Sequence, residues 1–98
     1  MDVLRRDRTR AEFEGFVAGH ADGLLRTGYL MTADLPEAEE LVQECLLRVA
    51  RRWPRVRSMD HPGAYARRIL VNLALDGRPR RARRMQELGQ DVMPEVMR

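Results

Sequence analysis

The feature that most constrains how this chain can fold is an amphipathic segment over residues 35–53, which lies between a helix-start signal and a helix-stop signal. Asp34 can cap free backbone amides and Pro36 is tolerated in a first helical turn, whereas Pro54 disfavours helical conformation at the residue before it. The apolar residues in between recur on one helix face: Ala38, Leu41, Val42, Cys45 and Val49, with Trp53 as an optional last member. The sequence therefore predicts a helix from about 35 to 53.

A second helix is predicted before this one. The sequence Thr9-Arg10-Ala11-Glu12 matches a capping box, so we expect the helix to begin at Thr9. Its apolar stripe runs to about residue 31 and consists of Phe13, Phe16, Val17, His20, Leu24 and Met31. Four glycines each weaken this helix by up to about 1 kcal/mol relative to alanine, and they also mark places where another helix could approach closely: Gly15, Gly19, Gly23 and Gly28.

A third helix is predicted after the irregular segment 54–61. Pro62 suits a first helical turn, and Asp60 precedes it. The residues expected to face inward are Tyr65, Ala66, Ile69, Leu70, Leu73 and Ala74. Gly77 and Pro79 interrupt this helix, because proline lacks a backbone donor and clashes one turn back. The arginine tract 78–84 therefore either follows a kink or begins a new short helix that ends near Gly89.

Together these segments predict an all-α fold, a compact three-helix bundle with or without a short fourth helix after Pro79. We expect residues 1–9 to be a flexible N-terminus, 10–84 to be the helical domain, and 85–98 to be a linker or tail with no second domain after it. A chain of 98 residues can close a modest core, in which the single cysteine, Cys45, is expected. Because no apolar run reaches the roughly 20 residues that cross a bilayer and no secretory signal is evident, we expect a cytoplasmic protein without a membrane partner.

The charged residues favour a polyanionic partner and no enzymatic chemistry. All 18 basic residues are arginine, which pairs bidentately with phosphate and carboxylate, although the net charge of +3 is small and a coding bias stays open as an explanation. No nucleophile and base, metal-ligand cluster or phosphate-binding loop can be assembled, so we expect no enzyme activity, metal or cofactor. His20 is expected in or beside the core, and His61 in a turn.

Two surfaces are candidates for binding. A strip away from the apolar face of segment 35–53 follows the helical spacing i, i+3, i+4, i+7 and consists of Glu40, Gln43, Glu44 and Leu47. It could dock on a basic helix, and an ordinary solvated face is the open alternative. Segment 54–61, the third helix with Asn72 and the arginine tract could contact phosphates and base edges of a nucleic acid. Trp53 and Tyr65 could stack on bases, but both are also core candidates, and for Tyr65 the core is favoured.

Two motifs resemble the extracytoplasmic-function sigma factors of the sigma-70 family. Residues 38–53 (AEELVQECLLRVARRW) are similar to their polymerase-binding helix, region two-point-two. Residues 64–81 (AYARRILVNLALDGRPRR) are similar to their minus-ten-element helix, with Asn72, Asp76 and Arg78 in the familiar spacing. The order and separation of the motifs also agree, so the resemblance covers about residues 10–84. It implies a compact helical bundle, the region 2 or sigma2 domain, acting in transcription initiation without making or breaking bonds.

The resemblance also implies partners and binding residues. The strip Glu40, Gln43, Glu44 and Leu47 would contact the clamp helices of the beta-prime subunit of bacterial RNA polymerase. The loop residues that would hold a base flipped from the nontemplate strand of promoter DNA are Ser58, Met59, Asp60 and His61. The residues that would help hold the melted minus-ten element are Arg68, Asn72, Arg78, Arg80 and Arg81. An anti-sigma factor is a further candidate partner.

The sequence departs from this family at the end of the third helix. Gly77 replaces a usually larger side chain, and Pro79 interrupts the basic helix. We also expect no helix-turn-helix domain that reads a minus-thirty-five element, and whether the sequence is a piece of a longer protein or a naturally shortened sigma-like protein stays open. Two other functions therefore stay open. One is a sigma mimic that binds an anti-sigma factor without binding DNA, and the other is a general helical nucleic-acid binder.

Overall fold

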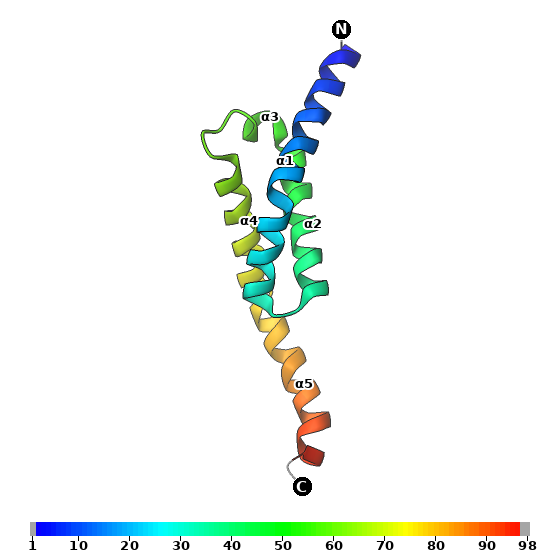
Figure 1. Cartoon of the computed structure of the whole chain (residues 1–98). Coiled ribbons are helices and arrows are strands. Elements are labelled where there is room, and N and C mark those ends of the chain that lie inside the picture. Colours follow the sequence, from blue (N-terminus) through cyan, green and yellow to red (C-terminus); the bar gives the residue numbers. More distant parts are fainter. Residues whose placement is uncertain (1, 97–98) are drawn as a thin grey trace.

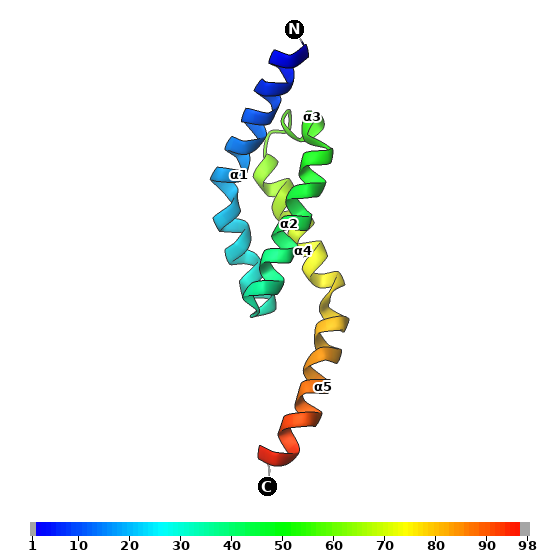
Figure 2. The ribbon, with the colours of Figure 1, turned by 90° about the vertical axis from the view of Figure 1, so that its right-hand side faces the viewer.

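The computed structural model describes residues 2–96, with side chains from residue 2 to residue 88, and this part of the chain is all-helical (Figure 1). The helices are α1 (Asp2–Thr32), α2 (Leu35–Arg51), α3 (Trp53–Val56), α4 (Pro62–Asp76) and α5 (Arg78–Val96). Helices α1, α2 and α4 pack on one another, α3 and the following loop lie at one end of this bundle, and α5 extends beyond the other (Figure 2). The predicted all-α class is confirmed.

The core lies where α1, α2 and α4 meet, and the predicted helix faces form it. The buried residues of α2 are Ala38, Val42, Cys45 and Val49, and those of α4 are Ala66, Leu70 and Ala74. Phe16 and Leu24 enter from α1, while Trp53 and Val56 of α3 cover one end. Cys45 is fully buried, as expected, and its Sγ donates to the carbonyl oxygen of Ala66 at 3.1 Å. Within residues 2–96 no helix is long and apolar enough to cross a membrane.

An aromatic cluster joins α1 to α3. The ring of Trp53 lies 5.4 Å from that of Phe13, edge to face, and 5.3 Å from that of Phe16. His20 stacks on Phe16 with ring centroids 4.3 Å apart, which places it at the core boundary as expected. Because Trp53 is only 6% exposed, it is a core residue and cannot stack on bases in this conformation. Tyr65 is half-buried and packs against the core, which confirms the favoured interpretation.

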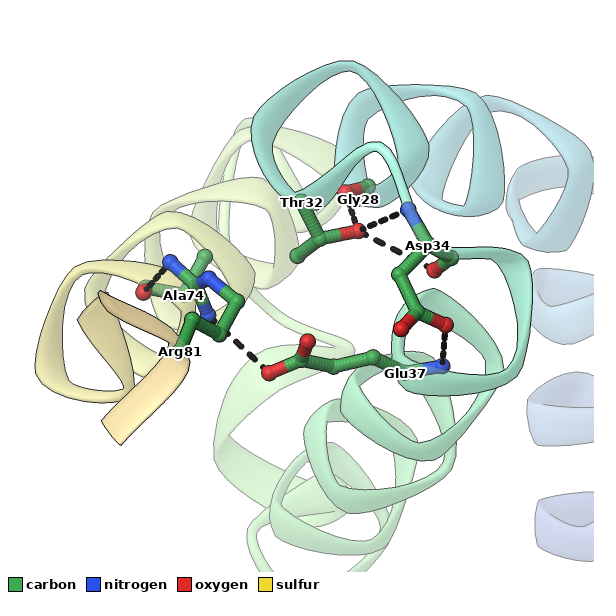
Figure 3. Close-up of polar contacts among 6 residues, drawn as sticks. All are labelled: Gly28, Thr32, Asp34, Glu37, Ala74 and Arg81. Carbon is green, nitrogen blue, oxygen red and sulfur yellow. Dashed lines mark hydrogen bonds and ion pairs between the residues drawn. The ribbon is translucent and has the colours of Figure 1, made fainter. Parts of the chain in front are cut away.

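The turn between α1 and α2 is held by a short network of hydrogen bonds (Figure 3). The Asp34 carboxylate accepts from the amide of Glu37 at 3.1 Å, so Asp34 is the predicted N-cap of α2. The Thr32 hydroxyl lies 2.9 Å from the carbonyl oxygen of Gly28 and accepts from the Asp34 amide at 3.2 Å. A Cβ added to Gly28 would lie 3.3 Å from that of Ala38, so this glycine marks a close helix contact. Added Cβ atoms at Gly15, Gly19 and Gly23 would meet nothing within 4 Å. The expectation that these three glycines also mark close helix contacts is therefore wrong.

Two helix boundaries near the ends of the bundle differ from the prediction. Helix α1 begins at Asp2, so the segment 1–9, expected to be flexible, is helical from Asp2 onward. The Thr9 hydroxyl donates to the carbonyl oxygen of Arg5 at 2.9 Å, a bond made inside a continuing helix, and it therefore caps nothing. Helix α2 ends at Arg51, because Pro54 already lies in the first turn of the separate helix α3.

The junction of α4 and α5 is a bend with nearly helical backbone. The Gly77 amide donates to Leu73 at 3.1 Å, and the Arg81 amide donates to Gly77 at 3.0 Å, while Pro79 has no amide hydrogen to give. The arginine tract therefore begins a new helix, but α5 continues through Gly89 to Val96. Residues 85–96, expected to be a loose tail, are helical. Methionine, glutamine, glutamate and leucine, which favour helix, begin this segment, and the helix continues through Gly89. Residues 97 and 98 of that tail lie outside the described residues.

Candidate functional site

The acidic strip of α2 points away from the bundle core. Glu40, Gln43 and Leu47 are exposed, and Leu47 leaves 52% of its surface to solvent. Glu44 is half-buried and accepts from the Nε of Arg48 at 3.1 Å. The predicted helical spacing therefore places all four residues on one side of α2, with an apolar side chain beside three polar ones.

The loop before α4 is anchored from both sides. The Arg57 guanidinium makes two hydrogen bonds to the Glu12 carboxylate of α1, at 2.7 and 2.9 Å, which fixes the start of the loop. Met59 is half-buried and packs against the core, so the loop has an apolar anchor. The remaining predicted base-contacting residues are exposed: Ser58, Asp60 and His61. The loop is thus held in place while presenting polar groups outward.

Helix α4 carries a polar outer face directly after this loop. Arg68 and Asn72 are both exposed and lie one helical turn apart, with Asp76 a further turn on. All three point away from the buried row of the same helix. An exposed amide and guanidinium at this spacing can contact base edges and phosphates along one strand.

The arginines predicted from the tract 78–84 do not share one environment. Arg78 and Arg80 are exposed. Arg81 is not: its side chain is 14% exposed, its Nη1 donates to the Glu37 carboxylate at 3.2 Å, and its Nη2 donates to the carbonyl oxygen of Ala74 (Figure 3). The Arg81 guanidinium therefore joins α5 to α2 and α4. No local pattern predicts this role, because Glu37 is 44 residues away.

The loop and the arginine tract lie at opposite ends of α4. That helix has 15 residues, so its axis is about 22 Å long. A hollow of about 600 Å³ lies beside its C-terminal half and brings Glu40 and Glu44 of the acidic strip near Asp76, Arg80 and Arg84. Among residues 2–88, no group of three or more acidic, histidine or cysteine side chains could hold a metal ion. The arrangement offers binding surfaces for charged macromolecules.

Comparison with known proteins identifies the class to which this fold and these surfaces belong. The chain is a member of the Sigma-70 region 2 family, whose model matches residues 16–84. It is 32% identical over 84 residues to an RNA polymerase sigma-E factor of Streptomyces coelicolor, and 31% identical over 85 residues to that of Streptomyces avermitilis. These matches cover 86% and 87% of this chain but 46% of each relative, so the chain spans about half the length of the curated relatives that it matches. No solved structure gives a significant match.

Proposed function

We propose that this chain is the part of an RNA polymerase sigma factor that docks on the core enzyme and holds the melted minus-ten element of a promoter. Family membership over residues 16–84 supports the assignment. The observation that carries it is the placement of two distinct exposed surfaces on one bundle, the acidic strip on α2 and the polar outer face of α4 with its anchored loop. One surface can then bind protein while the other binds DNA.

The acidic strip suits the beta-prime clamp helices as a basic partner. Glu40 and Gln43 offer acceptors, and the exposed Leu47 offers apolar area that would leave water on docking. Family membership favours this role over that of a mimic that binds no DNA. An anti-sigma factor would act by covering the same strip or the DNA-binding face.

The loop and α4 suit a single DNA strand. A base taken out of the duplex costs a few kcal/mol of lost stacking and pairing, and contacts to Ser58, Asp60 and His61 would offset that cost. Arg68 and Asn72 would hold the strand alongside, one by charge and one by hydrogen bonds to base edges. All of these steps are non-covalent.

The first test is binding to core polymerase, or to its isolated clamp helices, by the wild-type chain and by Glu40→Arg/Glu44→Arg. The matched control is Glu14→Arg/Asp22→Arg, which makes the same charge change at exposed positions of α1, outside the strip. We expect the strip variant to lose binding and the control to keep it. A folded wild-type chain that does not bind polymerase would contradict the assignment.

The second test measures binding to a nontemplate strand that carries a minus-ten element, across a range of salt concentrations. Arg68→Ala/Asn72→Ala should bind more weakly, with a shallower salt dependence because one phosphate contact is lost. Equal binding by this variant and the wild type would show that the DNA surface lies elsewhere.

A further inference from the structure

Two hollows lined by arginine lie at the end of the bundle that carries α3. The first, of about 340 Å³, lies between α2 and α4 and is lined by Arg48, Arg51, Arg52 and Tyr65 together with Glu44 and Ile69. The second, of about 420 Å³, shares Arg51 and Arg52 with the first and adds Arg55. We call the row Arg48, Arg51, Arg52 and Arg55 the arginine track; it is distinct from the arginine tract 78–84 of α5. Because the hollows share two residues, the track is continuous from the α2–α4 groove to α3.

The arginine track has an excess of positive charge. Glu44 is the only acidic residue that lines the two hollows, and it already pairs with Arg48 at 3.1 Å. Among the described residues, no carboxylate lies within 4.0 Å of the side chains of Arg51, Arg52 or Arg55. Three neighbouring guanidinium groups without a counter-charge repel one another, so an anion that binds between them gains from all three.

The first hollow also contains groups that suit a nucleotide better than a simple anion. The Arg52 Nη1 donates to the Tyr65 hydroxyl oxygen at 3.3 Å, which positions the guanidinium. Four of the five Arg52 donors and the tyrosine hydroxyl hydrogen are left for a ligand. Tyr65 and Ile69 supply apolar area beside these donors. Donors beside an aromatic ring match a phosphate followed by a sugar or base.

The arginine track lies close to the loop at 58–61, because Tyr65 lines the first hollow and also contacts the end of that loop. Tyr65 lies in the first turns of α4, and its amide donates to the carbonyl oxygen of His61 at 3.2 Å. A strand held by the loop could therefore continue past Tyr65 along the track. Such a path leads onto α2 and α3, away from Arg68, Asn72 and the arginines of α5.

We propose that the arginine track and Tyr65 bind the phosphodiester backbone of single-stranded nucleic acid that adjoins the segment held at the loop. Two parts of this inference rest on the proposed function: the identity of the strand, promoter DNA, and its attachment at the loop. The site reads charge and backbone, so it contributes affinity equally for every base sequence. It is separate from the residues of α4 and α5 assigned to the minus-ten element.

The experiment measures binding of a fluorescein-labelled single-stranded DNA of mixed sequence to the full chain by fluorescence anisotropy, across a salt titration. The variant is Arg51→Ala/Arg52→Ala, and the control is Arg10→Ala/Arg26→Ala, which removes the same charge from exposed positions of α1 outside both hollows. We expect the track variant to bind weaker by about tenfold for each arginine, and its salt slope to fall by about 1.4 because two phosphate contacts are lost. The control should bind nearly as the wild type does.

Three results would overturn the proposal: equal losses in the track variant and the control, no binding of DNA by the wild type, or competition by poly-glutamate as strong as that by unlabelled DNA. The last result would assign the track to an acidic protein. Circular dichroism of each variant shows whether the bundle is intact. Polymerase binding is measured separately. If the arginine track does not bind DNA but the chain still binds polymerase through the acidic strip, the track inference fails while the proposed docking function stands.

Discussion

At the scale of single residues, Cys45 shows how burial changes chemistry. Its side chain is fully buried, and the loss of hydration raises the pKa of the Cys45 thiol to about 11, above its ordinary value of 9.0. The folded state thus keeps a proton that the unfolded chain loses at lower pH. The resulting stabilisation is complete below about pH 9 and is lost as the pH rises through 11.

We therefore expect the free energy of unfolding to fall by about 2 kcal/mol between these two pH values because of this thiol. Urea unfolding across that range measures it. Cys45→Ala serves as the control, since it lacks the thiol and keeps every other ionisable side chain. An identical pH dependence in both proteins would show that the thiol does not contribute.

Ala33 is a second residue with a defined cost. It follows α1 with a φ of 55°, in the left-handed region that favours glycine, and its amide donates to Tyr29 at 2.7 Å. Ala33→Gly should raise the free energy of unfolding by about 0.5–1 kcal/mol because the strain of the Cβ disappears. Thermal unfolding monitors the change. The same substitution at the exposed, helical Ala50 should instead lower stability, and equal signs at the two positions would contradict the explanation.

At the scale of elements, the contact of Arg81 with Glu37 links α5 to α2. The two side chains are 14% and 16% exposed, so water screens their attraction less than on an open surface. A double-mutant cycle with Arg81→Ala and Glu37→Ala should give a coupling energy of about 1–2 kcal/mol in urea unfolding. The exposed pair Arg10 and Glu14, 4.0 Å apart on α1, is the control cycle and should give a value near zero. Equal coupling in both cycles would show that Arg81 contributes no more than a surface charge.

The packing of α1 on α2 makes two glycines behave differently. Gly23→Ala should stabilise the protein by up to about 1 kcal/mol, because alanine favours helix and an added Cβ meets nothing within 4 Å. Gly28→Ala should lose this gain, since its Cβ would lie 3.3 Å from that of Ala38 and the helices would have to move apart. Melting temperatures of the two variants test the contrast. A stabilising Gly28→Ala would show that the contact yields easily.

At the scale of the whole molecule, the protein is elongated. Its extents are 70 × 21 × 18 Å and its radius of gyration is 17.9 Å, whereas a compact domain of about this length has about 13 Å. The N-terminal turns of α1 and nearly all of α5 account for the difference (Figure 1). The predicted compact bundle is confirmed by α1, α2 and α4 packed together, and the elongated outline comes from the helical segments that extend beyond this bundle.

This shape predicts unequal local stability. From Arg83 to Leu88, every side chain of α5 is exposed, so packing adds little to that part of the helix. We expect its amides to exchange with solvent near the rate of an isolated helical peptide, while amides of α2 and α4 near Cys45 and Leu70 exchange only through global unfolding. Hydrogen exchange resolved by residue measures both. Equal protection in α5 and α2 would mean that α5 packs on another surface, such as a second copy of the chain.

The helices of the bundle and their buried faces could be predicted from local sequence patterns. Spacing of apolar residues and the positions of Asp34 and Pro62 are local properties, and they predicted the inward rows of α2 and α4 correctly. The resemblance of two motifs also indicated the family, while the assigned polymerase and DNA contacts stay predictions. Local signals were less informative at the ends of the chain, where α1 begins before Thr9 and α5 continues past Gly89.

Which arginines have partners depends on contacts between distant parts of the chain. Arg57 pairs with Glu12 across 45 positions, and Arg81 pairs with Glu37 across 44, whereas Arg51 and Arg52 line shared hollows beside Tyr65. Neighbouring residues in the sequence do not indicate whether an arginine forms an ion pair with a distant carboxylate. Its environment depends on the distance between side chains of different helices, and that distance is set by how the helices pack against their common core.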